Sequence, residues 1–339
     1  MKIGILYIIT GRYTIFWKEF YESCERYLLP DAEKFYFVFT DSPTIEYEKN
    51  NKNIYKIFQK NLGWPDNTLK RFHVFLKNQA LYKDMDYLYF FNANLKIVKE
   101  IRGTDFLPKA NNIMTCIHPS FFDKKKKLFP YEHNPLSTAY IPEGEGTYYV
   151  AGGLNGGERH VYISMMEELK ENIDIDEQNN IVAIWHDESQ LNAYIYHHDN
   201  YQTLTPSYLY PEGKNLPFEP YIMIRDKNRY GGHEKLRDGS LLDFCINNLA
   251  NSYIYIYGKG KKGLELQKKL KDFKININGF IISDDEKKNG EDVFYLSQLT
   301  TPPEQTKIIV ATRLEYQGTI KLLLKRAGYS KNIFLVYKV

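Results

Sequence analysis

The N-terminal part of the chain alternates between apolar runs and an amphipathic segment. Residues 3–9 and residues 35–39 are almost wholly apolar, and each run ends in a polar, turn-forming sequence. Between the two runs, apolar side chains recur near the helical period of about 3.6 residues, at Phe16, Phe20, Cys24 and Tyr27. Two apolar strands separated by a helix predict a β-α-β unit with a buried, parallel sheet.

The same signals continue through the middle of the chain, with one long interruption. A helix is expected at about residues 68–81, and a strand at residues 86–91 leads into Asn92-Ala93-Asn94. Residues 103–160 are rich in Gly, Pro and aromatic residues and show little periodicity, which predicts long functional loops. A further helix begins near Asp187, its expected N-cap.

The composition changes after residue 237, where a new set of strand and helix signals begins. Strands are expected at residues 253–257, 279–282, 308–311 and 333–336, with helices that end near residues 270 and 327. We therefore predict a first domain at residues 1–237, a linker at residues 238–250 and a small Rossmann-like α/β domain at residues 251–339.

Bulk properties fit a globular α/β protein and exclude several functional classes. The chain has 339 residues and a formal net charge of +3, which is too small for a nucleic-acid partner to be expected. Its three cysteines are far apart, which argues for a reducing compartment and against a disulfide framework or a zinc site. No apolar run approaches the length of a transmembrane segment, and no signal peptide is recognisable.

Two polar sequences follow predicted strands, where open α/β sheets bind their ligands. Thr10 and Tyr13 follow the first strand, at the position expected for a nucleotide. Asn92-Ala93-Asn94 stands where many sugar-nucleotide enzymes carry Asp-x-Asp, a motif whose two carboxylates hold a divalent metal. Because both positions are amides here, three interpretations stay open: a disabled metal site, a metal-free site and a polar turn.

Two further motifs each allow a structural and a functional interpretation. Asp187 and Glu188 stand side by side at a helix start, which suits capping and the helix dipole. A carboxylate pair beside an apolar platform such as Trp185 also suits glycosyl transfer, in which a carboxylate supports an electron-poor anomeric carbon. Gly258-x-Gly260-x-x-Gly263 follows a strand and opens a helix, as a dinucleotide fingerprint does, but a tight strand-to-helix turn can require the same glycines.

The order of these motifs resembles that of the family 6 glycosyltransferases, which include the blood-group A and B transferases and the α-1,3-galactosyltransferases. The resemblance is strongest to the bacterial members and covers about residues 1–237. It rests on Val38-Phe39-Thr40-Asp41, Asp66-Asn67-Thr68-Leu69-Lys70-Arg71, His118-Pro119, Ala139-Tyr140-Ile141-Pro142, Gly152-Gly153 and Trp185-His186-Asp187-Glu188-Ser189. The resemblance implies an A-type glycosyltransferase fold, a Rossmann-like mixed sheet flanked by helices, and retaining transfer from a UDP-sugar.

The resemblance also implies roles for individual residues. Those expected to bind the donor are Ile8, Ile9, Thr10, Tyr13, Arg71, Ala151, Gly152, Gly153 and Asp187. Glu188 is the expected catalytic carboxylate, and the expected acceptor contacts are His118, Trp185 and Glu212. Glu212 takes this role because Pro211 stands where the blood-group enzymes have Asp; Pro130 replaces another of their acceptor contacts.

The same comparison implies the substrates. Gly153 leaves room for an N-acetyl group, which favours UDP-GalNAc over UDP-Gal as the donor. The acceptor would be a β-galactoside, typically one that ends in Fucα1,2Gal, and the new linkage would be α-1,3. Such an enzyme is expected in the bacterial cytoplasm, with peripheral contact to the inner membrane as an additional expectation.

Cleavage of the sugar-phosphate bond places negative charge on UDP, and a divalent metal usually neutralises this charge. Amides supply no charge, so we expect a metal-independent enzyme without a cofactor, in which Asn92 and Asn94 donate N–H groups to the donor. The hypothesis assigns the missing positive charge to Lys227 in a mobile flap, assisted by Arg71 and Arg229. The alternatives are a basic surface loop at residues 224–233 and, for the whole domain, a sugar-nucleotide or glycan-binding module without turnover.

Overall fold

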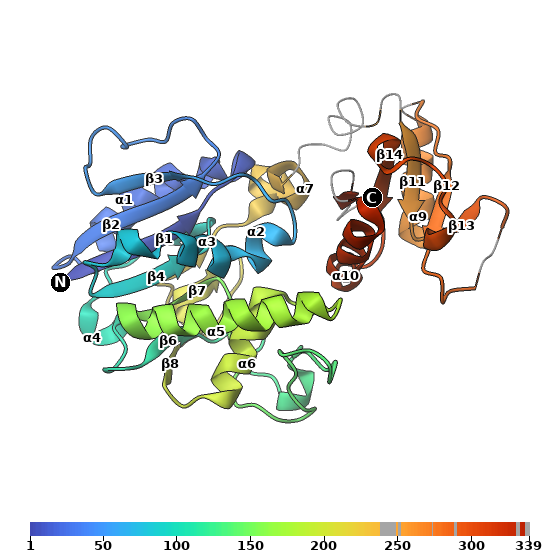
Figure 1. Cartoon of the computed structure of the whole chain (residues 1–339). Coiled ribbons are helices and arrows are strands. Elements are labelled where there is room, and N and C mark those ends of the chain that lie inside the picture. Colours follow the sequence, from blue (N-terminus) through green and yellow to red (C-terminus); the bar gives the residue numbers. More distant parts are fainter. Residues whose placement is uncertain (238–248, 250–251, 273, 288–289, 330–332, 336–339) are drawn as a thin grey trace. The chain divides into compact units, whose positions relative to one another are not determined.

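The computed structural model describes residues 1–237, 249, 252–272, 274–287, 290–329 and 333–335, and Figure 1 shows the chain as a ribbon. The chain divides into two compact units, which comprise residues 1–230 and residues 231–339. The predicted linker at residues 238–250 lies outside the described residues except for Leu249. The division between the units falls within the flap segment, ahead of the boundary predicted at residue 237.

The first unit is built on a seven-stranded sheet with the order β3-β2-β1-β4-β7-β6-β8. Its strands are β1 (Lys2–Ile8), β2 (Glu33–Thr40), β3 (Ile54–Phe58), β4 (Tyr87–Phe91), β6 (Ile113–Cys116), β7 (Leu154–Glu158) and β8 (Tyr201–Leu204). Neighbouring strands are parallel except at β7, which runs antiparallel to both β4 and β6. This mixed sheet confirms the predicted fold class.

Helices cover both faces of the sheet: α1 (Trp17–Tyr27) packs on one face, and α3 (Arg71–Lys77), α5 (Arg159–Gln178) and α6 (Asp187–His197) pack on the other. The other helices of this unit are η1 (Gly11–Phe16), α2 (Asp66–Leu69), η2 (Gln79–Tyr82), α4 (Gly103–Phe106), η3 (Lys126–Leu128), η4 (Pro206–Leu209) and η5 (Lys227–Tyr230). Alternate side chains of a strand point to opposite faces. On β1, Leu6 joins the core formed with α3, α5 and α6, whereas Tyr7 stacks on Phe20 of α1 with ring centroids 4.2 Å apart.

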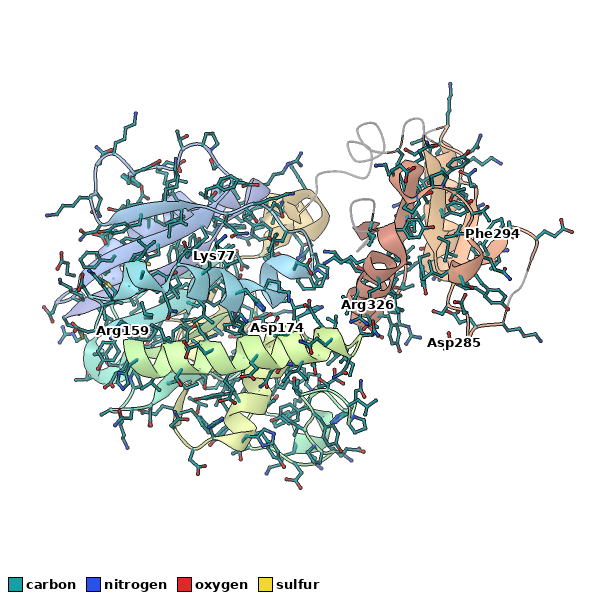
Figure 2. All side chains as sticks on the ribbon, in the orientation of Figure 1. Lys77, Arg159, Asp174, Asp285, Phe294 and Arg326 are labelled. Atoms are coloured by element: carbon teal, nitrogen blue, oxygen red, sulfur yellow. The ribbon has the colours of Figure 1, made fainter. Side chains whose placement is uncertain are left out.

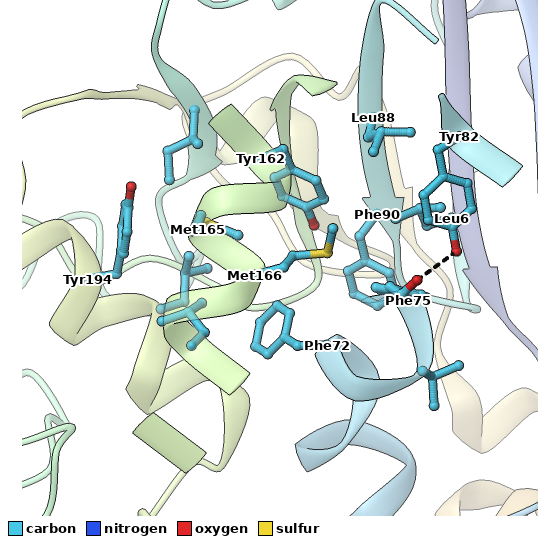
Figure 3. Close-up of a cluster of buried hydrophobic side chains, with 14 of the residues drawn as sticks. Leu6, Phe72, Phe75, Tyr82, Leu88, Phe90, Tyr162, Met165, Met166 and Tyr194 are labelled. Atoms are coloured by element: carbon cyan, nitrogen blue, oxygen red, sulfur yellow. Dashed lines mark hydrogen bonds between the residues drawn. The ribbon is translucent and has the colours of Figure 1, made fainter. Parts of the chain in front are cut away.

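The core between the sheet and helices α3, α5 and α6 supports the site (Figure 3). Phe72 of α3 and Met166 of α5 are fully buried there. Full burial of one such side chain contributes about 1.5–3 kcal/mol relative to its exposure. Outside this core, Asp174 of α5 (Figure 2) forms a hydrogen bond with His73 of α3 and an ion pair with Lys170 of its own helix. The packing fixes the helices that begin with Arg71 and Asp187, two predicted site residues.

The structure differs from three local predictions, two of them only in part. The helix expected at residues 68–81 is divided into α2, α3 and η2, since the backbone at Lys70 (φ −92°, ψ 10°) leaves helical geometry. The expected N-cap, Asp187, lies in the first turn of α6, and His186 takes the N-cap position with a φ of 58°. Residues 103–160 contain not only loops but also β6, β7 and the start of α5.

Strand β7 carries no recognisable strand signal, and the structure shows why. It reads LNGGE, and glycine disfavours strands. A Cβ at Gly156 would lie 2.1 Å from Cδ1 of Tyr89 on β4, and a Cβ at Gly157 would lie 2.9 Å from the carbonyl oxygen of Asn112. The close approach of neighbouring backbone and rings therefore requires glycine at both positions.

A small three-stranded sheet pairs the segment that follows the Asn motif with two strands near the end of the first unit. It consists of β5 (Leu95–Ile97), β10 (Ile222–Ile224) and β9 (Tyr210–Pro211), with β10 in the centre. Leu95 pairs with Ile224. Because β5 follows Asn92-Ala93-Asn94 and β10 precedes residues 225–230, this pairing brings the Asn motif and the predicted flap together.

The second unit contains a five-stranded parallel sheet with the order β13-β12-β11-β14-β15. Its main elements are α7 (Gly232–Arg237), β11 (Tyr253–Tyr257), α9 (Lys261–Asp272), β12 (Gly279–Ile282), β13 (Val293–Tyr295), β14 (Thr306–Val310), α10 (Leu314–Leu324) and β15 (Ile333–Leu335). The Rossmann-like arrangement agrees with the prediction, and β13 is an additional strand. Across the described parts of the whole chain, each helix is too short or too polar to cross a membrane.

Candidate active site

Glu188 lies in the first turn of α6, and two hydrogen bonds fix its carboxylate. Its Oε1 accepts from the Tyr149 hydroxyl at 2.7 Å, and its Oε2 accepts from the Gly152 amide at 2.8 Å. Burial raises the pKa of Glu188, while these hydrogen bonds act in the opposite direction. The protein itself thus holds the carboxylate in one orientation, as electrostatic preorganisation requires.

Asp187 forms a buried ion pair with Arg71. Both side chains are 2% exposed, and Arg71 Nη1 lies 3.0 Å from Asp187 Oδ2. The same Nη1 donates to the Gly152 carbonyl at 2.6 Å, and the guanidinium lies 4.3 Å from the centroid of the Phe90 ring. Burial raises the pKa of Asp187 to about 7, against the opposing effect of Arg71. In this arrangement Arg71 acts on the site by holding Asp187.

Part of this ion pair is left without an intramolecular partner. Among the described residues, Asp187 Oδ1 and the Nε and Nη2 atoms of Arg71 are buried without a hydrogen bond. An unpaired buried polar atom costs about 1–3 kcal/mol. Beside it, a Cβ at Gly152 would lie 3.2 Å from both Asp187 Oδ2 and Glu188 Cβ. Asp187 Oδ2 thus pairs with Arg71 next to a glycine, while Oδ1 keeps its capacity to accept a hydrogen bond from a hydroxyl of a polyhydroxylated ligand.

The glycine stretch also contacts the Asn motif. The backbone N–H of Asn92 donates to the Gly153 carbonyl at 2.8 Å, and a Cβ at Gly153 would lie 3.5 Å from Asn92 Cβ. Ala151 is buried, and its amide donates to the Cys116 carbonyl at 2.9 Å. The structure therefore brings the predicted donor stretch together with Asn92 and the carboxylate pair.

Asn92 and Asn94 use part of their hydrogen-bonding capacity inside the protein. Asn92 Nδ2 donates to Asn94 Oδ1 at 3.2 Å, and Asn94 Nδ2 donates to the Arg225 carbonyl at 2.8 Å. The motif is thus an ordered polar turn, but a primary amide has two N–H groups, so each side chain keeps one that these bonds do not use. Nowhere in the described ranges do three His, Cys, Asp or Glu side chains gather as a metal-binding group.

The predicted uridine-binding residues lie where β1 ends. Ile9 and Thr10 are buried, whereas Ile8 and Tyr13 are half-buried. The turn is fixed by Gly11, which has a φ of 59° and donates its amide to Asp41 Oδ1 at 2.7 Å. The backbone there is therefore rigid, and Ile8 and Tyr13 keep partly accessible side chains.

Glu212 holds residues 225–229, which belong to the flap predicted at residues 224–233. Its Oε2 accepts from Arg225 Nε at 3.2 Å and from the Asp226 amide at 2.8 Å, and its Oε1 accepts from Arg229 Nη1 at 2.8 Å. Arg225 also forms an ion pair with Glu19. In this conformation both carboxylate oxygens of Glu212, the expected acceptor contact, are engaged by the flap.

Lys227 lies beside the predicted nucleotide-binding segment. Its Nζ is 5.3 Å from the centroid of the Tyr13 ring, within the range of a cation–π interaction. Tyr230, at the end of η5, packs on Phe16 of η1 with ring centroids 4.7 Å apart. The flap is therefore packed against η1, and its lysine lies close to a residue expected to contact uridine.

The two remaining acceptor candidates flank the carboxylate pair in different ways. His118 is half-buried against the Tyr149 ring, with centroids 5.7 Å apart, and its Nδ1 accepts from the Ser120 amide at 3.1 Å. Burial lowers the pKa of His118 to about 4, so its ring is neutral at pH 7. Trp185 is 39% exposed just ahead of α6, so its indole is available as an apolar platform.

Two residues with evident roles were not assigned roles from the sequence. Tyr149 donates to Glu188, and its only sequence signal is an aromatic residue beside small ones. Asn192, one turn after Glu188, donates from Nδ2 to the Glu188 and Val150 carbonyls at 2.8 and 2.9 Å. No local pattern marks this buried amide, because it bonds to a segment far away in the sequence.

The sequence of the first unit matches a known family. Residues 1–233 match the family described as glycosyltransferase family 6. The chain belongs to glycosyltransferase family 6. This confirms the resemblance on which the residue assignments rest, and residues 234–339 lie outside the family match.

Related proteins support this membership. The O-antigen biosynthesis glycosyltransferase WbnI of Escherichia coli is 36% identical over 238 residues, which cover 69% of this chain and all of that protein. Histo-blood group ABO system transferase 1 of Rattus norvegicus is 28% identical over 62% of this chain and 61% of its own length. Globoside alpha-1,3-N-acetylgalactosaminyltransferase 1 of Gallus gallus is 27% identical, with 66% of each protein covered. The chain thus spans less than two thirds of the length of each of these two vertebrate relatives.

Membership of the family implies a nucleotide-sugar donor and a glycan acceptor.

Proposed function

We propose that the family 6 domain is a retaining α-1,3-glycosyltransferase that acts without a divalent metal. It moves GalNAc, or Gal, from a UDP-sugar to a β-galactoside acceptor that ends in Fucα1,2Gal. The names of related proteins support this class: one is an O-antigen biosynthesis glycosyltransferase, one belongs to the ABO system and one is an α-1,3-N-acetylgalactosaminyltransferase.

The arrangement of the carboxylate pair carries the proposal. Glu188 is held by Tyr149 and Gly152, while the adjacent Asp187 presents a buried Oδ1 without an intramolecular hydrogen bond among the described residues. In the proposed reaction, Asp187 accepts a hydrogen bond from a hydroxyl of the donor sugar. Glu188 stabilises the positive charge that develops at the anomeric carbon as UDP departs. A carboxylate retained only as a helix cap would not need both oxygens fixed by residues of another segment.

The departing UDP needs a positive charge, and Lys227 is proposed to supply it. Its place next to Tyr13 supports this assignment, as does the anchoring of its segment through Glu212. Asn92 and Asn94 contribute N–H groups rather than carboxylates, so the residues of this motif suit an anionic diphosphate better than a cation. Arg71 contributes through Asp187, because its guanidinium lies against that carboxylate.

A donor panel tests the activity and the donor preference. UDP release should be fastest with UDP-GalNAc, slower with UDP-Gal, and should rise strongly when 2′-fucosyllactose is added. The expected order follows from the open space at Gly153, where a Cβ would meet no described residue within 4 Å except Asn92. Chromatographic measurement of UDP and of the extended glycan distinguishes transfer from donor hydrolysis. Binding of UDP-sugars without turnover of any donor would instead indicate a binding module.

Chelation tests metal independence. The transfer rate in excess EDTA should stay within about twofold of the untreated rate, because no divalent ion is required for leaving-group stabilisation. UDP must be measured directly, since coupling enzymes depend on metals themselves. A loss of activity that Mn²⁺ or Mg²⁺ restores would contradict the metal-free mechanism.

A further inference from the structure

The second unit lies almost wholly outside the family match. The strand order of its sheet is the order found in nucleotide-binding α/β folds. If the five strands are numbered 1 to 5 along the chain, their order across the sheet is 3-2-1-4-5. Strands β12 and β13 lie on one side of β11, and β14 and β15 lie on the other. The winding direction therefore reverses between β11 and β14. In open parallel sheets this reversal opens a crevice at the carboxyl ends of the strands, and ligands bind there.

The turn after β11 contains three glycines, and the structural requirement for glycine differs among the three positions. Gly258 has a φ of 95°, which other residues rarely adopt. A Cβ at Gly263 would lie 2.0 Å from the Gly258 carbonyl oxygen, so α9 packs tightly on the turn. At Gly260 the φ is not in this left-handed region, and a Cβ there would have no described atom within 4 Å. The tight turn requires glycine at positions 258 and 263. It does not require glycine at position 260, where the lack of a side chain would instead allow a ligand to approach the backbone closely.

A lysine at the start of α9 and an arginine in the loop after β14 lie at this switch point. A Cβ at Gly258 would lie 2.9 Å from the methyl group of Thr312, so the loops after β11 and β14 touch at the switch point. Lys262, in the first turn of α9, donates to the Thr312 carbonyl at 3.4 Å. The side chain of Arg313 in the second loop is 75% exposed, and its Nη1 lies 3.7 Å from Oε1 of Glu315 in α10. Lys262 thus stands at the start of α9, where helix amides already favour an anion, and Arg313 directly follows Thr312, the residue that Lys262 contacts.

The end of β12, the strand next to β11, carries carboxylates. Residues 284–286 are all acidic, and Figure 2 labels Asp285 in this loop. Asp284 Oδ1 accepts from the amide and the hydroxyl of Ser297 at 3.2 and 2.9 Å, which leaves its second oxygen outside these bonds. A carboxylate at the end of the second strand binds ribose hydroxyls in dinucleotide-binding folds.

We propose that the second unit is a binding site for a nucleoside diphosphate with an unmodified ribose. The diphosphate lies over Gly260 against the start of α9, between Lys262 and Arg313, and the ribose lies toward Asp284. The carboxylate favours free 2′- and 3′-hydroxyls over a 2′-phosphate. This site is separate from the donor site of the family 6 domain and does not depend on the function proposed for it.

Substitution of Gly260 by Asp tests the site in the full-length protein. The open space accommodates the side chain, and Asp is favoured next to a helix start, so the variant should fold. The new carboxylate would meet the diphosphate, and the Kd for ADP or NAD⁺ measured by isothermal titration calorimetry should rise at least about tenfold. NADP⁺ should bind more weakly than NAD⁺ to the unmodified protein.

The matched control is Lys269→Ala, which makes the same change in net charge near the far end of α9. It should leave nucleotide affinity unchanged, and thermal melts of both variants should show intact folds. UDP serves as a third probe, and the Gly260→Asp variant should lose one UDP-binding event relative to the unmodified protein, whether or not the family 6 domain contributes another. If none of ADP, NAD⁺ and UDP shows a binding component that Gly260→Asp removes, the proposed site is overturned.

Discussion

Replacement of Glu188 by Gln is expected to lower kcat for glycosyl transfer by at least about 10²-fold, which corresponds to about 2.7 kcal/mol of barrier. The amide keeps the size of the carboxylate but removes the negative charge that would face the electron-poor anomeric carbon. The KM for the donor should change much less, because the change acts on a charge that develops in the transition state. Steady-state kinetics with UDP-GalNAc and 2′-fucosyllactose measure both quantities.

Glu171→Gln is the matched control for this experiment. It makes the same chemical change on an exposed position of α5, and it should leave kcat unaltered. Thermal unfolding of Glu188→Gln checks that the contacts of Tyr149 and Gly152 with residue 188 still support the fold. A kcat close to that of the unmodified enzyme would show that Glu188 is only part of the helix start, and would remove it from the mechanism.

Replacement of Lys227 by Ala is expected to have the second large effect, and it should lower kcat by at least about 10²-fold. In the proposed metal-free mechanism, the departing diphosphate depends on a side-chain cation, and the Nζ of Lys227 lies 5.3 Å from the centroid of the Tyr13 ring at the predicted nucleotide site. Lys227→Arg should retain more activity than Lys227→Ala, because it keeps the charge while changing its geometry.

Lys77→Ala provides the comparison for Lys227. Lys77 is exposed at the end of α3 and is labelled in Figure 2, so its loss changes the net charge equally without touching the flap. Added Mn²⁺ should not rescue Lys227→Ala if the amide motif cannot hold a metal. A rate near that of the unmodified enzyme would favour the alternative made from the sequence, a basic surface loop at residues 224–233.

The residues that could be predicted from the sequence are those whose signal is local. Apolar runs identified β1, β2, β4 and most strands of the second unit, because a buried strand needs apolar side chains at successive positions. The family motifs placed Asp187 and Glu188 in one string, and family membership confirms the resemblance that carried them. Strand β7 could not be predicted, because its glycines are required by Tyr89 and Asn112, which come from other segments.

The sequence by itself determined the fold class, the family and the adjacent carboxylates, since each is encoded in neighbouring residues or in an ordered series of short motifs. Only the tertiary structure decided what holds those carboxylates. Arg71 pairs with Asp187, Tyr149 donates to Glu188, and Glu212 engages the flap rather than standing open toward an acceptor. The first two contacts join segments far apart in the chain, near the edge where the main sheet brings together the carboxyl ends of β1 and β4 and the start of β7. The third contact forms beside the paired strands β9 and β10 of the small sheet. Hydrogen bonds and ion pairs depend on such distances and on burial, which no local periodicity encodes.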